Sequence, residues 1–169
     1  SNPIMESVLL FHNASIQLLI HFNQPLQRSE PTIHILQRAM VALARKIANR
    51  ILKPYIIRDT AITDLDLNDE EIFKSKSFIF LGGVVKFTLN KLLNEGDISP
   101  AGHQKFFVAA HHYFRSSLNY ILTKFPLNDE VITNASWMNV PERINIEWEN
   151  VEYFHNRYQP NFKNILTDI

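Results

Sequence analysis

The chain has 169 residues, with 17 Lys and Arg against 17 Asp and Glu, 7 His, no Cys and 46% hydrophobic residues. This length suits a single domain with its own core. The lack of cysteine excludes disulfides, cysteine-based zinc sites and a cysteine nucleophile. The small number of glycines argues against disorder and phosphate-cradling loops, and a net charge of zero removes any global argument for nucleic acid binding. The composition indicates a soluble globular domain and leaves its function open.

The ends of the chain carry little information about the fold. Ser1 and Asn2 are typical of the pair left when an expression tag is cleaved. We therefore expect one helical domain over residues 3–162, followed by a tail at 163–169. No signal-peptide pattern is present, and polar residues interrupt the apolar stretch 8–22, which makes it too polar for a membrane span. These features favour an intracellular protein without membrane contact.

Helical periodicity dominates the first third of the chain. Over residues 4–22, apolar side chains recur at three- and four-residue steps, and Pro25 ends the run. A second helix is expected from Pro31 to Lys53. At about 100° per residue its apolar side chains fall on one side. Five cations fall on the opposite side of this helix: Arg38, Arg45, Lys46, Arg50 and Lys53. The second helix is therefore predicted to have an almost uniformly basic outer face.

Four further helices are expected, over residues 77–94, 99–125, 128–137 and 148–158. The first contains Gly82 and Gly83, which weaken it, so a short strand over 78–81 is an alternative. Ser99 and Pro100 are typical of the cap and first position of the next helix. No convincing strand pair is present. The predicted fold class is all-α, as a single irregular bundle of five to six helices.

Charge is distributed in blocks. Residues 1–58 carry a net charge of +5, residues 59–71 carry six acids and no base, and residues 72–169 carry a net charge of +1. We expect 59–71 to form a surface loop that leads into a short helical turn near 68–73. Two interpretations stay open: the acidic loop folds back and neutralises the basic helix, or the basic face contacts phosphate or an acidic partner.

The residues with potential chemistry form no catalytic or metal-binding pattern. His103 and His111 are eight residues apart, whereas zinc-binding pairs on a helix need a spacing of three or four. His112 adjoins His111 and points in another direction. A calcium loop starting at Asp64 would need a glycine at its sixth position and a glutamate at its twelfth, and has neither. We predict no catalytic residue, no metal, no cofactor and no small-molecule substrate.

Aromatic residues are concentrated near the end of the chain. Trp137, Trp148, Tyr153, Phe154 and Tyr158 fall within 22 residues. Such side chains can stack on bases, but a helical domain with 12 Phe also needs large side chains in its core. We expect this cluster to belong to the core.

Several short segments, taken in order, resemble the hAT superfamily of transposases. They are residues 22–36 (FNQPLQRSEPTIHIL), 52–57 (LKPYII), 69–73 (DEEIF), 125–131 (FPLNDEV) and 151–158 (VEYFHNRY). The resemblance implies the all-helical insertion that interrupts the RNase H-like catalytic fold of these enzymes. No residue here matches the family's catalytic acids. The zinc finger common in the family is also absent, because the chain has no cysteine.

The resemblance implies a non-catalytic helical domain of a transposase-derived nuclear protein, active or host-domesticated. Its expected role is assembly, or contact with DNA or a protein partner, through Arg38, Arg45, Lys46, Arg50 and Lys53. The alternative is a helical protein-interaction or dimerisation adaptor unrelated to DNA. A protein partner or self-association is expected in both cases, and an enzyme in neither.

Overall fold

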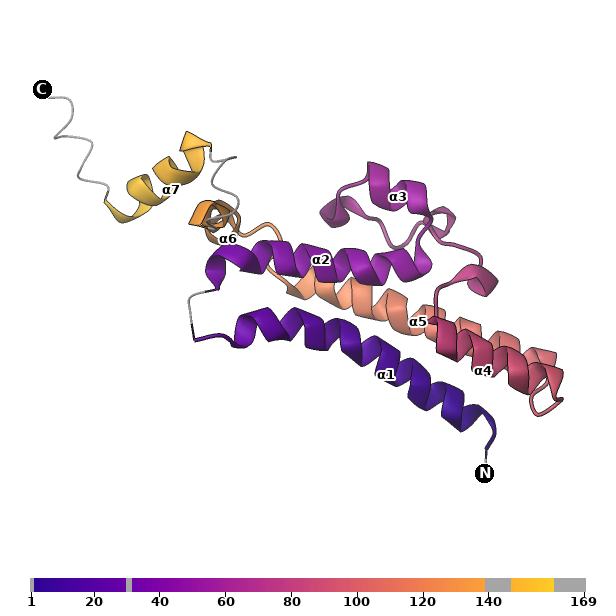
Figure 1. Cartoon of the computed structure of the whole chain (residues 1–169). Coiled ribbons are helices and arrows are strands. Elements are labelled where there is room, and N and C mark those ends of the chain that lie inside the picture. The colour runs from indigo at the N-terminus through magenta and orange to yellow at the C-terminus, as the bar shows by residue number, and fades with distance from the viewer. Residues whose placement is uncertain (1, 30–31, 139–146, 160–169) are drawn as a thin grey trace, which may run out of the picture.

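The computed structural model describes residues 2–29, 32–138 and 147–159, and the regular secondary structure of this part is helical (Figure 1). Its only β pairing is an isolated bridge between Leu52 and Phe73. The described α-helices are α1 Ile4–Asn23, α2 Ile33–Ile51, α3 Pro54–Asp59, α4 Gly83–Asn94, α5 Pro100–Lys124, α6 Glu130–Asn134 and α7 Trp148–Tyr158, with short 3₁₀ turns between several of them. The predicted all-α class is confirmed, with α3 as a helix that the sequence analysis did not predict.

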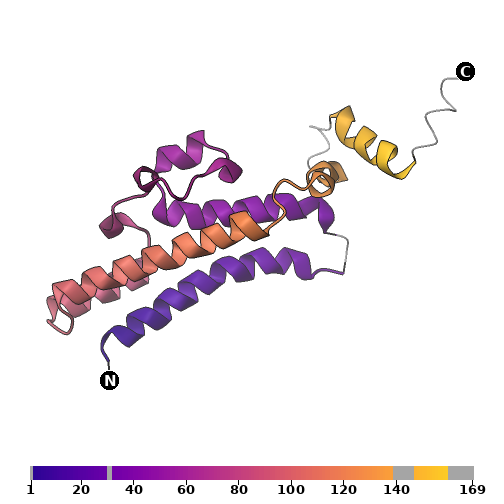
Figure 2. The ribbon, with the colours of Figure 1, turned by 180° about the vertical axis from the view of Figure 1, so that it is seen from behind.

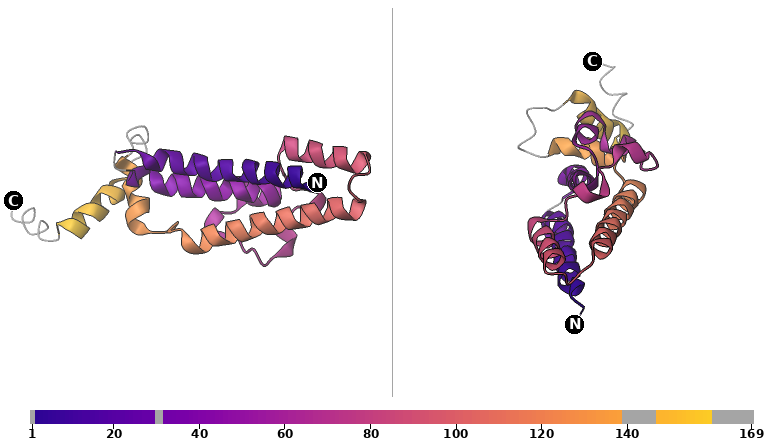
Figure 3. Two further views of the ribbon diagram at one scale, coloured as in Figure 1. Left: turned by 90° about the horizontal axis from the view of Figure 1, so that it is seen from below. Right: turned by 90° about the vertical axis from the view of Figure 1, so that its right-hand side faces the viewer.

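Helix α2 lies at the centre of the molecule. It packs against α1, α3, α5 and α6, and its most extensive partner is α5 (Figures 1 and 2). Ala44, Ala48 and Ile51 are fully buried, and the small side chains of the two alanines let neighbouring helices approach closely. When the molecule is viewed along the helices, α1 and α5 lie on different sides of α2 (Figure 3). Most of the core is therefore built around α2.

The signals predicted at several helix ends are present in the structure. The hydroxyl of Ser99 accepts a hydrogen bond from the Gly102 amide at 3.1 Å. After α4, Gly96 takes a φ of +78°, and the Asp97 amide donates to the Leu92 carbonyl at 2.9 Å. This arrangement is a Schellman motif, in which a left-handed residue closes the last turn of the helix. These ends follow from local sequence.

The predicted helix over 77–94 is wrong in its first turn and a half. Lys76–Phe78 forms a 3₁₀ turn, the chain then runs extended, and α4 begins only at Gly83. Gly82 has φ +105° and ψ 145°, a conformation that residues with a Cβ rarely adopt. Ile79 is buried while Phe80 is exposed, as expected for extended chain. The alternative of a strand over 78–81 is also wrong, since these described residues pair with no strand.

The acidic segment is more structured than a loop. It follows α3 and contains two 3₁₀ turns, Ile62–Asp64 and Glu70–Ile72. Asp69 caps the second turn, because its carboxylate accepts a hydrogen bond from the Glu71 amide at 2.8 Å. The predicted turn near 68–73 is confirmed.

The late aromatic residues do not form core. Helix α7 has the predicted bounds and contacts α6 and the 3₁₀ turn Ala135–Met138, but none of its residues is buried. Trp148 is 72% exposed. The rings of Phe154 and Tyr158 stack on each other 6.1 Å apart. The expectation of a core cluster is therefore wrong for α7. The side chain of Trp137 and residues 163–169 lie outside the described part.

We expect Gly82→Ala to lower the free energy of unfolding by about 1–3 kcal/mol, because a Cβ is strained at φ +105°. Gly83→Ala is the matched control. Its φ is ordinary and nothing lies within 4 Å of the added methyl, so it should be neutral or stabilising by up to about 1 kcal/mol. Urea unfolding of both variants measures the difference, and equal losses would contradict the role of Gly82.

Candidate functional site

The structure does not present the predicted basic residues as one free surface. Arg38, Arg45, Lys46 and Arg50 lie on α2, and Lys53 follows its end. Arg45 donates a hydrogen bond from Nη1 to the Ile57 carbonyl at 3.0 Å. Arg50 is half-buried and donates from Nη1 to the Phe80 carbonyl at 3.3 Å.

Arg50 also takes part in aromatic contacts. Its guanidinium carbon lies 4.7 Å from the centroid of the Phe80 ring and 5.7 Å from that of Phe114. Burial lowers the pKa of Arg50 from its ordinary value. The Phe80 amide in turn donates to the Arg50 carbonyl at 2.9 Å. Arg50 therefore attaches the extended segment before α4 to the end of α2.

The same region closes the C-terminal end of α2. The last carbonyls of a helix have no partner within it. Here the ammonium of Lys74 donates to the Asn49 carbonyl at 2.7 Å, and the Lys74 amide donates to the Ile51 carbonyl at 2.8 Å. Burial lowers the pKa of Lys74. Much of the positive charge near α2 thus serves to satisfy backbone carbonyls.

The acidic segment is attached to α5. Arg115 forms an ion pair with Glu70 at 2.6 Å, donates from Nη2 to the Leu67 carbonyl at 2.6 Å and lies 4.9 Å from the Phe73 ring centroid. The hydrogen bond from Arg115 lowers the pKa of Glu70. Between acids 59–71 and the cations at 45, 46, 50 and 53, all of them described, no ion pair is found. The acidic segment therefore does not neutralise these four cations by direct pairing.

Part of the basic face borders a shallow groove between α1 and α2. Arg38 and Lys46 are exposed and, with His21 of α1, line a hollow of about 260 Å³.

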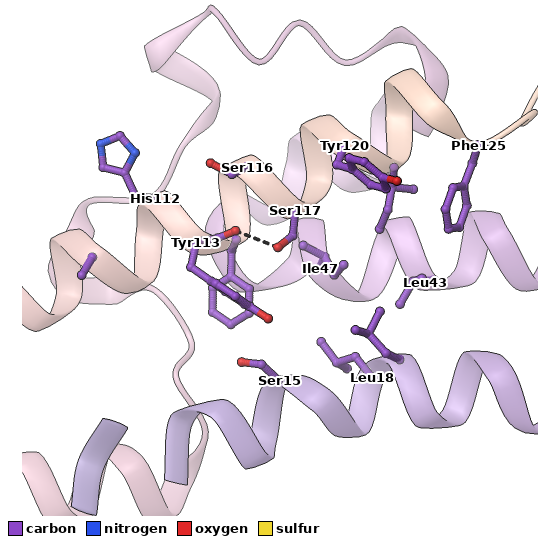
Figure 4. Close-up of a pocket in the computed structure, with 14 residues that line it drawn as sticks. Ser15, Leu18, Leu43, Ile47, His112, Tyr113, Ser116, Ser117, Tyr120 and Phe125 are labelled. Carbon is purple, nitrogen blue, oxygen red and sulfur yellow. Dashed lines mark hydrogen bonds between the residues drawn. The ribbon is translucent and has the colours of Figure 1, made fainter. Parts of the chain in front are cut away.

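A larger hollow lies between α1 and α5, and we call it the α1–α5 groove (Figure 4). Its volume is about 740 Å³. Its lining is almost entirely apolar, with α2 contributing Leu43 and Ile47. The lining residues are Ser15, Leu18, Leu19, Leu43, Ile47, Ala109, His112, Tyr113, Phe114, Ser116, Ser117, Tyr120, Ile121 and Phe125.

Aromatic contacts bound this groove at both ends. At one end Phe11 of α1 packs edge-on against Tyr113 and Phe114 of α5, with ring centroids 5.4 and 5.3 Å apart. At the other end Phe22 stacks on Phe125 at 5.6 Å. The stretch of α1 between Phe11 and Phe22 spans three turns, or roughly 16 Å at 1.5 Å per residue. The groove is thus about as long as a short helical segment.

The polar groups of the groove are few and do not suggest catalysis. The Ser117 hydroxyl donates to the Tyr113 carbonyl at 2.8 Å within α5 (Figure 4). The Ser15 hydroxyl is buried and has no hydrogen-bond partner among the described residues. His112 is exposed at the rim. With this lining, the groove can accommodate apolar side chains.

Next to the groove, α1 presents an exposed row of apolar side chains, which we call the α1 stripe. Its members are Met5, Leu9, Ile16, Leu19 and Ile20. Leu9 is 63% exposed, although it lies in the middle of a helix that also contributes to the core. Leu19 belongs to both the stripe and the groove lining. The spacing of these residues was visible in the sequence, but hydrophobicity alone cannot tell an exposed face from a buried one.

The histidines of α5 are placed separately. His111 is buried against Phe73, with ring centroids 5.0 Å apart, and its Nε2 has no described hydrogen-bond partner. His103 Nε2 and Oδ1 of Asn90, on α4, form a hydrogen bond at 3.2 Å. Within the described ranges no three His, Asp or Glu side chains gather closely enough to hold a metal ion. Each described helix is too short or too polar to cross a membrane.

No protein-family model, curated protein or solved structure matches the chain. The resemblance to hAT transposases therefore stays a prediction.

We expect Arg50→Ala to lower the free energy of unfolding by about 2–3 kcal/mol, because a charged hydrogen bond and a cation–π contact are lost together. The matched control is Lys46→Ala on the same helix, whose side chain is exposed, with an expected change within about 0.5 kcal/mol. Urea unfolding measures both. If Arg50→Ala left stability unchanged, Arg50 would not be a structural residue.

His111 should make stability depend on pH. Burial, followed by the nearby charges of Lys76 and Arg115, lowers the pKa of His111 below its ordinary value of 6.5. As the pH falls through about 6.5, the unfolded chain binds a proton that the folded chain does not. The free energy of unfolding therefore decreases until the pH is below the folded-state pKa.

Urea unfolding at pH 7.5 and pH 5.5 tests this prediction. His111→Leu should lose less stability between the two pH values than the unaltered chain does. His112→Leu, at the neighbouring exposed position, should lose as much as the unaltered chain. An identical pH dependence in all three proteins would contradict the role of His111.

Proposed function

We propose that this chain is a non-catalytic helical domain that works in protein assembly. Its contact face is the apolar surface formed by the α1–α5 groove and the α1 stripe, and the bound element is the apolar face of a partner helix. The observation that carries the proposal is a groove of about 740 Å³ with an apolar lining, joined through Leu19 to an exposed apolar row. Exposed apolar surface of this continuity is typical of interaction sites.

The shape of the groove favours a helix as its occupant. The two aromatic contacts, Phe11 with Phe114 and Phe22 with Phe125, leave three turns of α1 between them. An amphipathic helix docks into such a groove through apolar side chains at three- and four-residue steps.

Contact with DNA through the basic face is the less favoured alternative. Phosphate binding needs cations that can reach the phosphates. Arg45 and Arg50 instead donate hydrogen bonds to the carbonyls of Ile57 and Phe80. Turning either guanidinium toward a phosphate would leave its carbonyl without this hydrogen bond. Arg38 and Lys46 are exposed and Lys53 is half-buried, but three cations supply only a small electrostatic contribution.

The parent protein is proposed from the resemblance alone. The ordered segments from 22–36 to 151–158 favour a hAT transposase or a protein derived from one, with a nuclear location. In that setting the helical domain would assemble the larger protein, while cleavage chemistry would belong to another domain.

Binding of the neutral apolar dye Nile red to the dilute chain tests the contact face. Leu19→Glu and Tyr120→Glu place charges on the rim of the groove at exposed positions. We expect each variant to lower dye fluorescence severalfold, because a charge disfavours apolar binding. Tyr55→Glu on α3, also exposed, should leave the fluorescence unchanged. Unchanged fluorescence in the two groove variants would refute this contact face.

A short DNA duplex tests the alternative. We expect no binding between about 50 and 200 mM salt, whereas several phosphate contacts would give an affinity that falls by about 10³-fold or more across this range. Binding with that salt dependence, abolished by Lys46→Glu, would favour DNA contact over protein assembly.

A further inference from the structure

The exposed apolar side chains of α1 are arranged symmetrically along the helix. Met5 and Leu9 precede a common midpoint by the same intervals at which Ile20 and Ile16 follow it. The midpoint lies between His12 and Asn13, which are also exposed. At about 100° per residue, Met5, Leu9, Ile16 and Ile20 fall within one narrow sector of the helix surface. These four members of the α1 stripe therefore look alike from either end, whereas the fifth, Leu19, has Glu6 as its symmetric counterpart.

From this symmetry we propose that a second copy of this chain covers the α1 stripe, with the two α1 helices packed antiparallel. The two-fold axis passes between His12 and Asn13. In this register Met5 faces Ile20 of the other copy, and Leu9 faces Ile16. A two-fold interface needs a patch that is complementary to itself, and the four symmetric members of the α1 stripe meet this requirement. The inference rests on the proposed function, because it names the partner of the same apolar surface.

The charges of α1 permit this pairing. The helix contains one acid, Glu6, and neither lysine nor arginine. Bringing two copies together therefore places no fixed like charges opposite each other along the axis. The spacing of the four symmetric residues also suits two helices: Met5 to Leu9 and Ile16 to Ile20 are steps of four residues, and Leu9 to Ile16 is a step of seven, which is the repeat of a coiled-coil seam.

The area of the stripe is sufficient for a dimer. Its five side chains are between 38% and 63% exposed. Covering them would remove roughly 500 Å² from water on each copy, or about 1,000 Å² in total before any flanking residues are counted, which reaches the size of a specific interface. A weak to moderate dimer is the expected result.

Charge substitutions test the antiparallel register. Leu9→Lys and Ile16→Glu each place two unpaired charges in the apolar interface, so each should weaken self-association by about a hundredfold or more. The double variant should recover most of the lost self-association. In the dimer, lysine at position 9 of each copy faces glutamate at position 16 of the other copy, so both charges are paired. In a parallel pair the same double variant would bring like charges together. Analytical ultracentrifugation over a concentration series measures the dimer, and circular dichroism confirms folding.

Cysteine cross-linking gives a second readout, because the natural chain has no cysteine. His12→Cys should form a disulfide dimer by itself under mild oxidation. Met5→Cys should do so only when mixed with Ile20→Cys. Tyr55→Cys is the matched control, since Tyr55 is 50% exposed and Met5 51% exposed, and it should form no disulfide-linked dimer.

The outcomes separate this inference from the proposed function. A chain that remains monomeric at all concentrations, yet binds Nile red in a groove-dependent way, overturns the antiparallel dimer and leaves the contact face in place. Self-association that is not rescued by the Leu9→Lys, Ile16→Glu double variant also overturns it. Loss of groove-dependent dye binding instead overturns the proposed function.

Discussion

The enclosure of α2 by its neighbours is the constraint on which the rest of the structure depends. A helix packed against α1, α3, α5 and α6 keeps one exposed side, which carries Arg38 and Lys46. Its C-terminal end is covered by the chain that follows, so polar groups near that end must find partners within the protein. Arg45 and Arg50 find them in backbone carbonyls of the chain that follows α2. Lys74 does the same for the carbonyls of the last turn. The positive charge of this region thus holds the connection from α2 to α4 in place, which a view of α2 as an isolated amphipathic helix does not reveal.

The parts of the fold that depend on local chemistry could be read from the sequence. Ser99 before a proline, and a glycine at position 96, mark helix ends wherever they occur, because they act on the nearest backbone groups. Gly82 was visible too, but periodicity continued across it, and only the backbone shows that its φ of +105° separates extended chain from helix.

The candidate site was harder to predict, because it depends on which faces meet in space. A helical projection assigns one apolar side to the core, and this works for Phe11. Such a projection assigns every apolar side chain to the core, so it did not identify Leu9 and Ile16 as surface residues. The groove depends on contacts between α1 and α5 that are about a hundred residues apart, such as Phe11 with Phe114. No local pattern contains that information.

The order of the helices along the chain has a consequence for biosynthesis. The main packing partner of α2 is α5, and the whole segment from α3 to α4 must leave the ribosome before α5 can dock. During that interval the side of α2 that will carry Ala44, Ala48 and Ile51 into the core stays open to water. Nascent chains with uncovered apolar helices tend to associate wrongly. The α1–α2 hairpin is therefore open to wrong association until α5 has been synthesised.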